Sequence, residues 1–164
     1  MATPFDTNKM LADAFEPKRA NRFYFQFADE SLPAFVVKTF SKPSYTAAPI
    51  EIDYLNQKRY LAGKGVWNTI DMTLHDPIAP SSAQRVMEWV RLQHETISGR
   101  DGYAAFYKKT INLYALDPVG AKVEDWELRG CFCESVAFGA YDMANAEPVE
   151  VSITLRPDSC ILKY

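Results

Sequence analysis

The sequence predicts a mainly β fold: an antiparallel β-barrel or sandwich with one flanking amphipathic helix. About seven or eight segments alternate apolar and polar residues with period two, whereas one segment carries a strong helical stripe. Helices and strands do not alternate along the chain, which argues against a parallel sheet. At 164 residues, with no internal repeat or linker, the chain fits a single domain.

The first element follows an N-terminal arm. Residues 1–20 show no strong periodicity, and we interpret them as this arm, followed by one β domain over residues 21–164. Good strand formers occupy alternate positions at Phe23, Phe25 and Phe27, which predicts the first strand. A second apolar run follows at residues 35–40 and predicts the next one.

Residues 50–74 predict three long strands joined by two turns. The apolar side chains that begin with Ile50 share one face, and the polar, often acidic, side chains that begin with Glu51 share the other. We expect the turns at residues 55–57 and 62–65, because the second segment contains two glycines.

One strong helix is predicted at residues 82–98. Ser81 and Gln84 have the spacing of a capping box, and Gly99 suits the C-terminal cap. The apolar stripe consists of Ala83, Val86, Val90 and Ile97, with Trp89 on its flank.

Strands resume after the helix. We expect them at residues 110–116, 126–138 and 149–156, the last with a clean alternation of apolar and polar side chains. Pro157 cannot donate a ladder hydrogen bond, so this strand should stop or bulge there.

Composition excludes several classes of protein. Hydrophobic residues make up 48% and charged residues 24%, which excludes wholesale disorder. The formal net charge is −3 and basic residues cluster only in pairs, so we expect no tight binding of nucleic acid. Because the sequence has neither a signal-peptide pattern nor an apolar run of about 18 residues, we expect synthesis in the cytosol and no membrane insertion.

No residue pattern predicts catalysis or a cofactor. His94 should lie on the wet side of the helix, and His75 ends a strand, where capping a turn is the simpler role. Nucleophile and phosphate-loop motifs are absent, so we expect a protein that is not an enzyme.

The three cysteines, Cys131, Cys133 and Cys160, cannot all pair within one chain. They are too few for a structural zinc site, which needs four nitrogen or sulfur ligands. Free, buried thiols are the first interpretation. Because Cys131 and Cys133 share one face of a strand, any disulfide would reach another strand or another subunit.

Long strands with one polar face leave unpaired edges, which a symmetric assembly of copies can satisfy. From about residue 21 to the C-terminus, the sequence resembles the tail tube proteins of contractile-tailed bacteriophages, especially those of T-even-like phages. The marks of the resemblance, in order, are Tyr54-Leu55-Asn56-Gln57-Lys58, Leu61-Ala62-Gly63, Trp67, Asp71-Met72-Thr73-Leu74, a helix with Arg85, Met87 and Trp89, Tyr107-Lys108-Lys109, Arg129-Gly130, Glu134-Ser135-Val136, Tyr141-Asp142 and a final strand from Val149 to Leu155.

The resemblance implies a subunit that oligomerises into a larger β-barrel ring. Six copies would form each ring, four strands per subunit would line the barrel, and rings would stack helically into a tube for DNA and the tape-measure protein. It further implies a sheath protein outside the tube, baseplate and tail-terminator proteins at its ends, and a location in the virion tail after assembly in the host cytoplasm. Type VI secretion and contractile bacteriocin tubes are related in fold.

Three sets of residues are expected to serve this assembly, although alternation alone leaves open which strands face the lumen. The lumen surface should include Glu51, Asp53, Thr69, Asp71 and Thr73, whose carboxylates would keep DNA from adhering. Contact between rings is expected from the arm and from the turn residues Leu55, Asn56, Gln57, Lys58 and Arg59. Cys131, Cys133 or Cys160 would cross-link subunits once the particle leaves the reducing cytosol.

Two alternatives compete with a phage tail tube. One is the tube of a type VI secretion system or a contractile bacteriocin. The other is a monomeric β-barrel that binds a small apolar ligand, which the 13% aromatic content favours.

Overall fold

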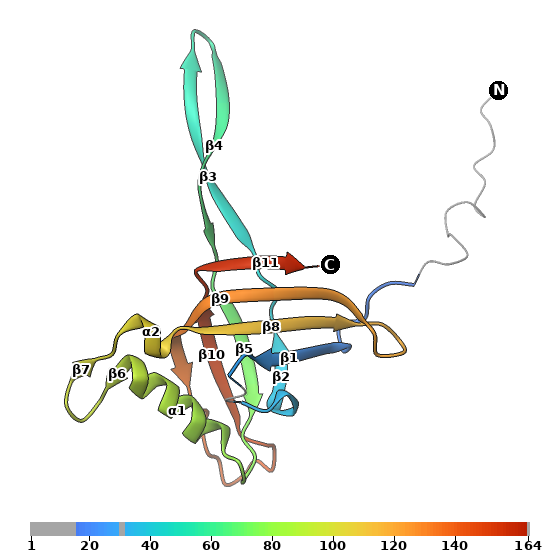
Figure 1. Ribbon diagram of the computed structural model, residues 1–164, viewed down its shortest axis with the longest axis vertical. Helices are drawn as coiled ribbons and strands as arrows, with labels where there is room; N and C mark the ends of the chain where they lie inside the picture. Colours follow the sequence, from blue (N-terminus) through green and yellow to red (C-terminus); the bar gives the residue numbers. More distant parts are fainter. Residues whose placement is uncertain (1–15, 30–31, 164) are drawn as a thin grey trace, which may run out of the picture.

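The computed structural model describes residues 16–29 and 32–163. Its strands form two antiparallel sheets and two hairpins, so the predicted mainly β class is confirmed (Figure 1). The elements, in order, are β1 (Phe23–Phe27), a 3-10 turn (Ala34–Val36), β2 (Val37–Phe40), β3 (Tyr45–Tyr54), β4 (Gln57–Trp67), β5 (Ile70–His75), α1 (Ser82–Gln93), β6 (His94–Glu95), β7 (Arg100–Asp101), α2 (Ala104–Tyr107), β8 (Lys109–Leu116), β9 (Lys122–Ala137), β10 (Glu150–Arg156) and β11 (Ser159–Lys163).

The long strand β9 belongs to both sheets. Its N-terminal half pairs with β8 and β11, and with β1 beyond β8 these strands form sheet 1. Its C-terminal half pairs with β10, and with β5 and β2 beyond β10 these strands form sheet 2. The pairing changes partner near Gly130, whose φ of +66° allows the strand to bend.

The core lies between the two sheets. In sheet 2, Ile70, Met72 and Leu74 of β5 are buried while the residues between them are not, as the period-two pattern predicts. The alternation predicted for β10 is confirmed in the same way, and the strand ends at Arg156, before Pro157. The buried apolar residues of the core are Phe25, Phe27, Leu32, Val36, Ile70, Met72, Leu74, Val86, Trp89, Ile111, Leu113, Leu128, Cys131, Cys133, Val151, Ile153, Leu155 and Cys160.

The barrel is open in the single chain. β1 at the edge of sheet 1 and β2 at the edge of sheet 2 do not pair with each other. Their only described link through aromatic rings is Phe25 against Phe40, with centroids 5.0 Å apart. This opening between β1 and β2 is called the seam below.

Helix α1 packs on the core through Val86 and Trp89. The Trp89 ring meets Phe27 edge-on at 5.5 Å, and its Nε1–H donates to the carbonyl oxygen of Tyr107 at 2.6 Å. Trp89 is therefore part of the buried face of α1, beside Val86.

The N-terminus of α1 is capped more strongly than the sequence indicated. The hydroxyl of Ser81 accepts from the N–H of Gln84 at 3.4 Å, as predicted. In addition, Oδ1 of Asp76 accepts from the backbone N–H groups of Ser82 and Ala83 at 2.9 and 3.2 Å. Asp76, the neighbour of His75, therefore adds to the cap that Ser81 provides.

Two predicted boundaries were wrong. α1 ends at Gln93, before residue 98, because the next residues form β6 and pair with β7 in a hairpin whose tight turn contains Gly99 at φ +65°. β4 runs without a turn through residues 62–65, because a neighbouring strand approaches there. A side chain at Gly65 would collide with the Tyr45 ring, so this glycine serves close packing rather than a turn.

Residues 1–15 of the predicted arm lie outside the described residues. The remainder of the arm begins at Glu16, and Lys18 Nζ lies 2.7 Å from a carboxylate oxygen of Glu124 on β9. Strand β11 was not predicted, because it is short and begins only two residues after Pro157.

We expect Gly130→Ala to destabilise the protein more than Gly120→Ala. Both glycines have positive φ, which costs an alanine about 1–2 kcal/mol, but a Cβ at Gly120 meets nothing within 4 Å. At Gly130 the Cβ would lie 2.2 Å from the Asp158 carboxylate, which is paired with Lys108, adding about 1–3 kcal/mol. Urea unfolding of both variants measures the difference, and equal losses would contradict the close approach of Asp158 to Gly130.

Candidate assembly surfaces

The β3–β4 hairpin projects far from the two sheets (Figure 1). Every residue from Ala48 to Ala62 is exposed, so this part of the hairpin contributes nothing to the core of its own chain. A two-stranded hairpin is at best marginally stable alone in water. The exposed part of the hairpin is therefore a candidate surface for contact with another molecule.

The two faces of the hairpin differ in chemistry. One face carries Ile50, Ile52 and Tyr54 together with Leu61, all between 44% and 73% exposed. The opposite face carries Glu51 and Asp53, as the alternation predicted. Exposed apolar side chains on adjacent positions of one face are typical of interaction sites.

Charges on the hairpin are only partly paired. Lys58 Nζ lies 2.9 Å from Glu51 and 4.0 Å from Asp53. Arg59, on the adjacent position, makes no ion pair with any residue that the structure describes, and neither does Lys64. The hairpin thus presents Arg59, a cation without an ion pair among the described residues, on its apolar face opposite Ile52.

The turn of the hairpin is strained at Leu55. Its φ is +53°, a conformation that bulky residues rarely adopt, and its side chain is 90% exposed. Glycine or asparagine would fit this position without cost. An exposed leucine held at positive φ therefore points to a role for its side chain outside the chain.

The outward face of sheet 2 is polar. Asp71 and Thr73 of β5 lie beside Ser152 and Thr154 of β10, and the Thr154 hydroxyl donates to Asp71 Oδ1 at 3.0 Å. On the same sheet, Arg156 donates to Glu134 and lowers the pKa of that carboxyl. The outward face of sheet 2 thus carries polar side chains that hydrogen-bond to one another across neighbouring strands.

Sheet 2 has two free edges among the described residues. One is β2, which pairs only with β5, and the other is residues 132–137 of β9, which pair with β10 on one side and no strand on the other. Free edges carry unpaired backbone groups that recruit further strands.

The predicted lumen residues fall into two groups. Asp71 and Thr73 lie together on the outward face of sheet 2, whereas Glu51 and Asp53 lie on the hairpin, with Thr69 at the junction between β4 and β5. The predicted ring-contact residues Leu55, Asn56, Gln57, Lys58 and Arg59 are all exposed at the hairpin tip. Alternation along the last predicted strand placed Ser152 and Thr154 outward, but their register beside Thr73 and Asp71 is fixed only by the fold.

All three thiols are free and lie in the core. Burial raises the pKa of Cys131 and of Cys133 to about 12 and that of Cys160 to about 11. At neutral pH these thiols are protonated and poor nucleophiles. A disulfide between subunits stays a prediction, and it would require a core strand to expose its sulfur.

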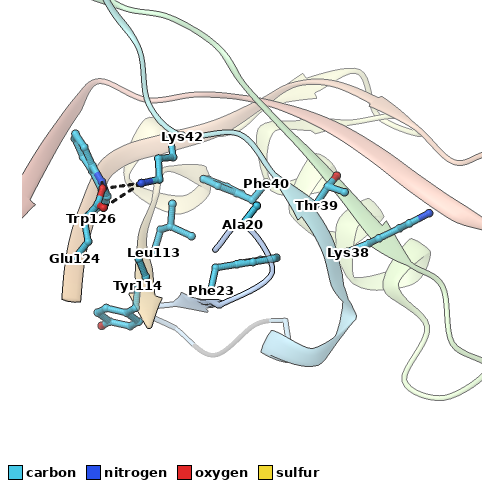
Figure 2. A pocket seen from close by; sticks show the side chains of 11 residues that line it. Ala20, Phe23, Lys38, Thr39, Phe40, Lys42, Leu113, Tyr114, Glu124 and Trp126 are labelled. Atoms are coloured by element: carbon cyan, nitrogen blue, oxygen red, sulfur yellow. Dashed lines mark hydrogen bonds and ion pairs between the residues drawn. The ribbon is translucent and has the colours of Figure 1, made fainter. Parts of the chain in front are cut away.

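A pocket of about 360 Å³ opens at the seam (Figure 2). Its walls are the apolar side chains of Phe23, Phe40, Leu113 and Trp126. Its rim carries Glu124, which Figure 2 shows bonded to Lys42. The volume is within the range of small-molecule sites, about 300–1,000 Å³.

Glu124 ties three segments together at this rim. It accepts from Lys18 at 2.7 Å, from the Trp126 indole at 2.5 Å and from Lys42 at 2.9 Å. These hydrogen bonds, with the largest effect from Lys18, lower the pKa of Glu124 from its usual 4.5 to about 2. Because Lys42 precedes β3, this carboxylate anchors the root of the hairpin to β9.

The described residues contain no group of histidine, cysteine or acidic side chains arranged to bind a metal. None of the helices described is long and apolar enough to cross a membrane. His94 is exposed, as predicted, with Nδ1 2.7 Å from an oxygen of Asp101.

No protein-family model and no curated protein matches this sequence. Solved structures match it over most of its length. A chain of the sheath-tube complex of an extracellular contractile injection system, PVC, in the extended state has a TM-score of 0.71 at 17% identity, covering 97% of this chain and 98% of that one. A chain of the tube terminating cap of the anti-feeding prophage has a TM-score of 0.70 at 18% identity, covering 97% and 99%. The SPP1 tail tube has a TM-score of 0.56 at 15% identity, covering 90% and 79%.

At these identities the likeness establishes the fold. The chain has the fold of tail tube proteins, shared by phage tails and contractile injection systems, and the resemblance seen in the sequence is confirmed at that level.

We expect Glu124→Gln to lower the free energy of unfolding at pH 7 by about 1.5–3 kcal/mol, since it removes a charge-assisted cluster. The folded-state pKa of Glu124 is depressed, so its contribution is present above pH 4.5 and is lost as pH falls toward 2. Between pH 4.5 and pH 2, the free energy of unfolding of the variant should therefore fall less steeply than that of the wild-type protein. Glu51→Gln, in an exposed ion pair, is the control with little effect. If the stability of Glu124→Gln fell as steeply with pH as that of the wild-type protein, the role of Glu124 in joining these segments would be contradicted.

Proposed function

We propose that this chain is the subunit of the tube in a contractile injection machine, and that its copies form rings that stack inside a sheath. The observation that carries this proposal is the β3–β4 hairpin, whose apolar face and strained tip are exposed in the part of the chain that the structure describes. The tail tube fold supports it. The role is structural and not enzymatic.

Ring closure uses the free edges of sheet 2. We propose that β2 of one copy faces residues 132–137 of β9 in the next, which gives each subunit four strands in a continuous barrel. Six copies per ring follow from the family resemblance. Closure through neighbours removes every free edge of that sheet without open-ended aggregation.

The lumen in this arrangement is lined by the outward face of sheet 2. Asp71 and Thr73 lie on that face. The hairpin continues the direction of β2 and β5, so we assign Glu51, Asp53 and Thr69 to the same wall, extended toward the adjacent ring. We add Thr154 and Ser152, which lie on the same face, to the proposed lumen residues.

The finer proposal is a phage tail tube that conducts DNA during ejection. A polar wall with carboxylates, on a chain of net charge −3, would slide along DNA without binding it. The partners would be a sheath outside, a tape-measure protein inside, and baseplate and terminator proteins at the ends, in the virion tail.

A second candidate is the tube of an injection system that carries cargo other than DNA. The favouring observation is the TM-score of 0.71 with the PVC sheath-tube complex against 0.56 with the SPP1 tail tube. Nuclease-protected DNA in purified particles would support the phage tail, and its absence from particles of full length would support this second candidate.

The monomeric ligand-binding alternative rests on the pocket at the seam. Negative-stain microscopy of the purified protein separates it from a tube: rings or tubes support the proposed function. A monomer that is stabilised by apolar ligands and forms no rings would overturn it.

Replacing residues 48–64 by an Asn-Gly turn should abolish long tubes but preserve the folded monomer. The removed segment makes no core contact, while Tyr45 and Trp67, with ring centroids 5.3 Å apart, still close the root. Thermal unfolding should change little, whereas microscopy should show rings in place of tubes. Tubes of normal length would count against the hairpin as the contact between rings.

A cysteine in place of Thr73 tests which wall faces the lumen. In assembled tubes, a small maleimide should label Thr73→Cys and a polymer-linked maleimide should not, because the bore would exclude it. Gln26→Cys, on the outward face of sheet 1, is the matched control that should accept both. The native thiols are buried and do not interfere. Equal labelling of both variants by the large reagent would reject the lumen assignment.

A further inference from the structure

The two ends of sheet 2 present different structures. The hairpin leaves where β2 ends and β5 begins, while the loop between β9 and β10, residues 138–149, lies where β5 ends (Figure 1). Pairing fixes this placement: Glu150 is opposite His75, and the N–H of Asp76 donates to the carbonyl oxygen of Val149 at 3.1 Å. Sheet 2 therefore has one end at the hairpin, called the hairpin end, and one end at the β9–β10 loop, called the loop end.

The loop end offers apolar and acidic groups. Tyr141 and Met143 are almost completely exposed, at 90% and 109%. Asp142 and Glu147 make no ion pair with any described residue, and residues 138–149 contain no lysine or arginine. Beside them is a hollow of about 420 Å³ with predominantly polar walls.

The loop has a defined shape before any partner arrives. Oδ1 of Asp142 accepts from the N–H of Ala144 at 2.9 Å, and Oδ1 of Asn145 accepts from the N–H of Glu147 at 3.0 Å. Preorganised loops lose less conformational entropy on binding. One oxygen of Asp142 and the whole Glu147 carboxylate remain for a cation.

The hairpin tip is chemically complementary. It carries Tyr54 and Leu55 as exposed apolar groups and Arg59 as a cation without an ion pair among the described residues. An arginine between two carboxylates is a favourable interface pair. The strained Leu55 lies beside it.

The tip and the loop of one chain cannot meet. β5 has six residues and β3 has ten, and a strand rises about 3.3 Å per residue, so the tip lies on the order of 50 Å from its own loop end. The partner of the tip is then a second copy, placed with its loop end toward the hairpin end of the first.

We propose that the hairpin tip of one copy docks on the β9–β10 loop of a second copy, with Arg59 between Asp142 and Glu147 and with Tyr54 and Leu55 against Tyr141 and Met143. This contact rests on the proposed stacking of rings and names its partner surface. It gives the stack a direction, because each ring joins the next through unlike ends.

Charge reversal tests the contact in the full-length chain. We expect Arg59→Glu, and separately Asp142→Lys with Glu147→Lys, to reduce the protein found in tubes at least about tenfold at a fixed concentration, because the pair repeats at every ring. The combined triple variant should recover tubes. Lys64→Glu makes the same charge change nearer the hairpin root and is the matched control with normal tubes. Ring formation and thermal stability of each variant are measured in parallel.

Disulfide trapping provides a second measurement that does not depend on charge. Leu55→Cys with Met143→Cys should give oxidised ladders of two, three and more copies, whereas Leu55→Cys with Val119→Cys, an equally exposed position on the β8–β9 loop, should stay monomeric.

The outcomes separate the two proposals. Wild-type tubes with normal assembly of Arg59→Glu, or ladders in the Val119 control alone, would overturn the docking contact and leave the tube function standing. A wild-type chain that forms neither rings nor tubes, and no ladder in the Leu55 and Met143 pair, would overturn both.

Discussion

The bend in β9 at Gly130 is the constraint on which the other features depend. One continuous strand supplies the pairing for both sheets, so the angle at the bend sets how the two sheets face each other and enclose the core. Asp158 lies where a side chain on that residue would go, and Lys108 holds the carboxylate in place. Beyond the bend, β9 loses its β8 partner and becomes a free edge of sheet 2.

In the single chain, the same geometry leaves an open seam and an exposed hairpin. The sheets separate at the seam between β1 and β2, and the chain leaves β2 toward a hairpin that is exposed throughout residues 48–62. Glu124 bonds Lys18, which precedes β1, and Lys42, which precedes β3, and so joins these two segments beside the seam. An anchored root gives the hairpin a fixed direction, which a contact between rings would need.

The proposed tube assembly would connect these surfaces into one arrangement. Lateral pairing through the edges of sheet 2 would make a ring, and hairpin-to-loop contact would join rings in one direction.

The sequence by itself determined the fold class, most strands and the helix start, because period-two patterns such as Val151, Ile153 and Leu155 are local and need no long-range information. It also placed the hairpin tip at residues 55–59. Tertiary structure decided what local pattern cannot: that Gly65 makes room for Tyr45 instead of a turn, that α1 stops at Gln93 because β6 and β7 pair, and that Asp71 and Thr154 share a face of sheet 2 while Glu51 lies on the projecting hairpin. These depend on contacts between residues distant in the chain, which are fixed only when strands take their register.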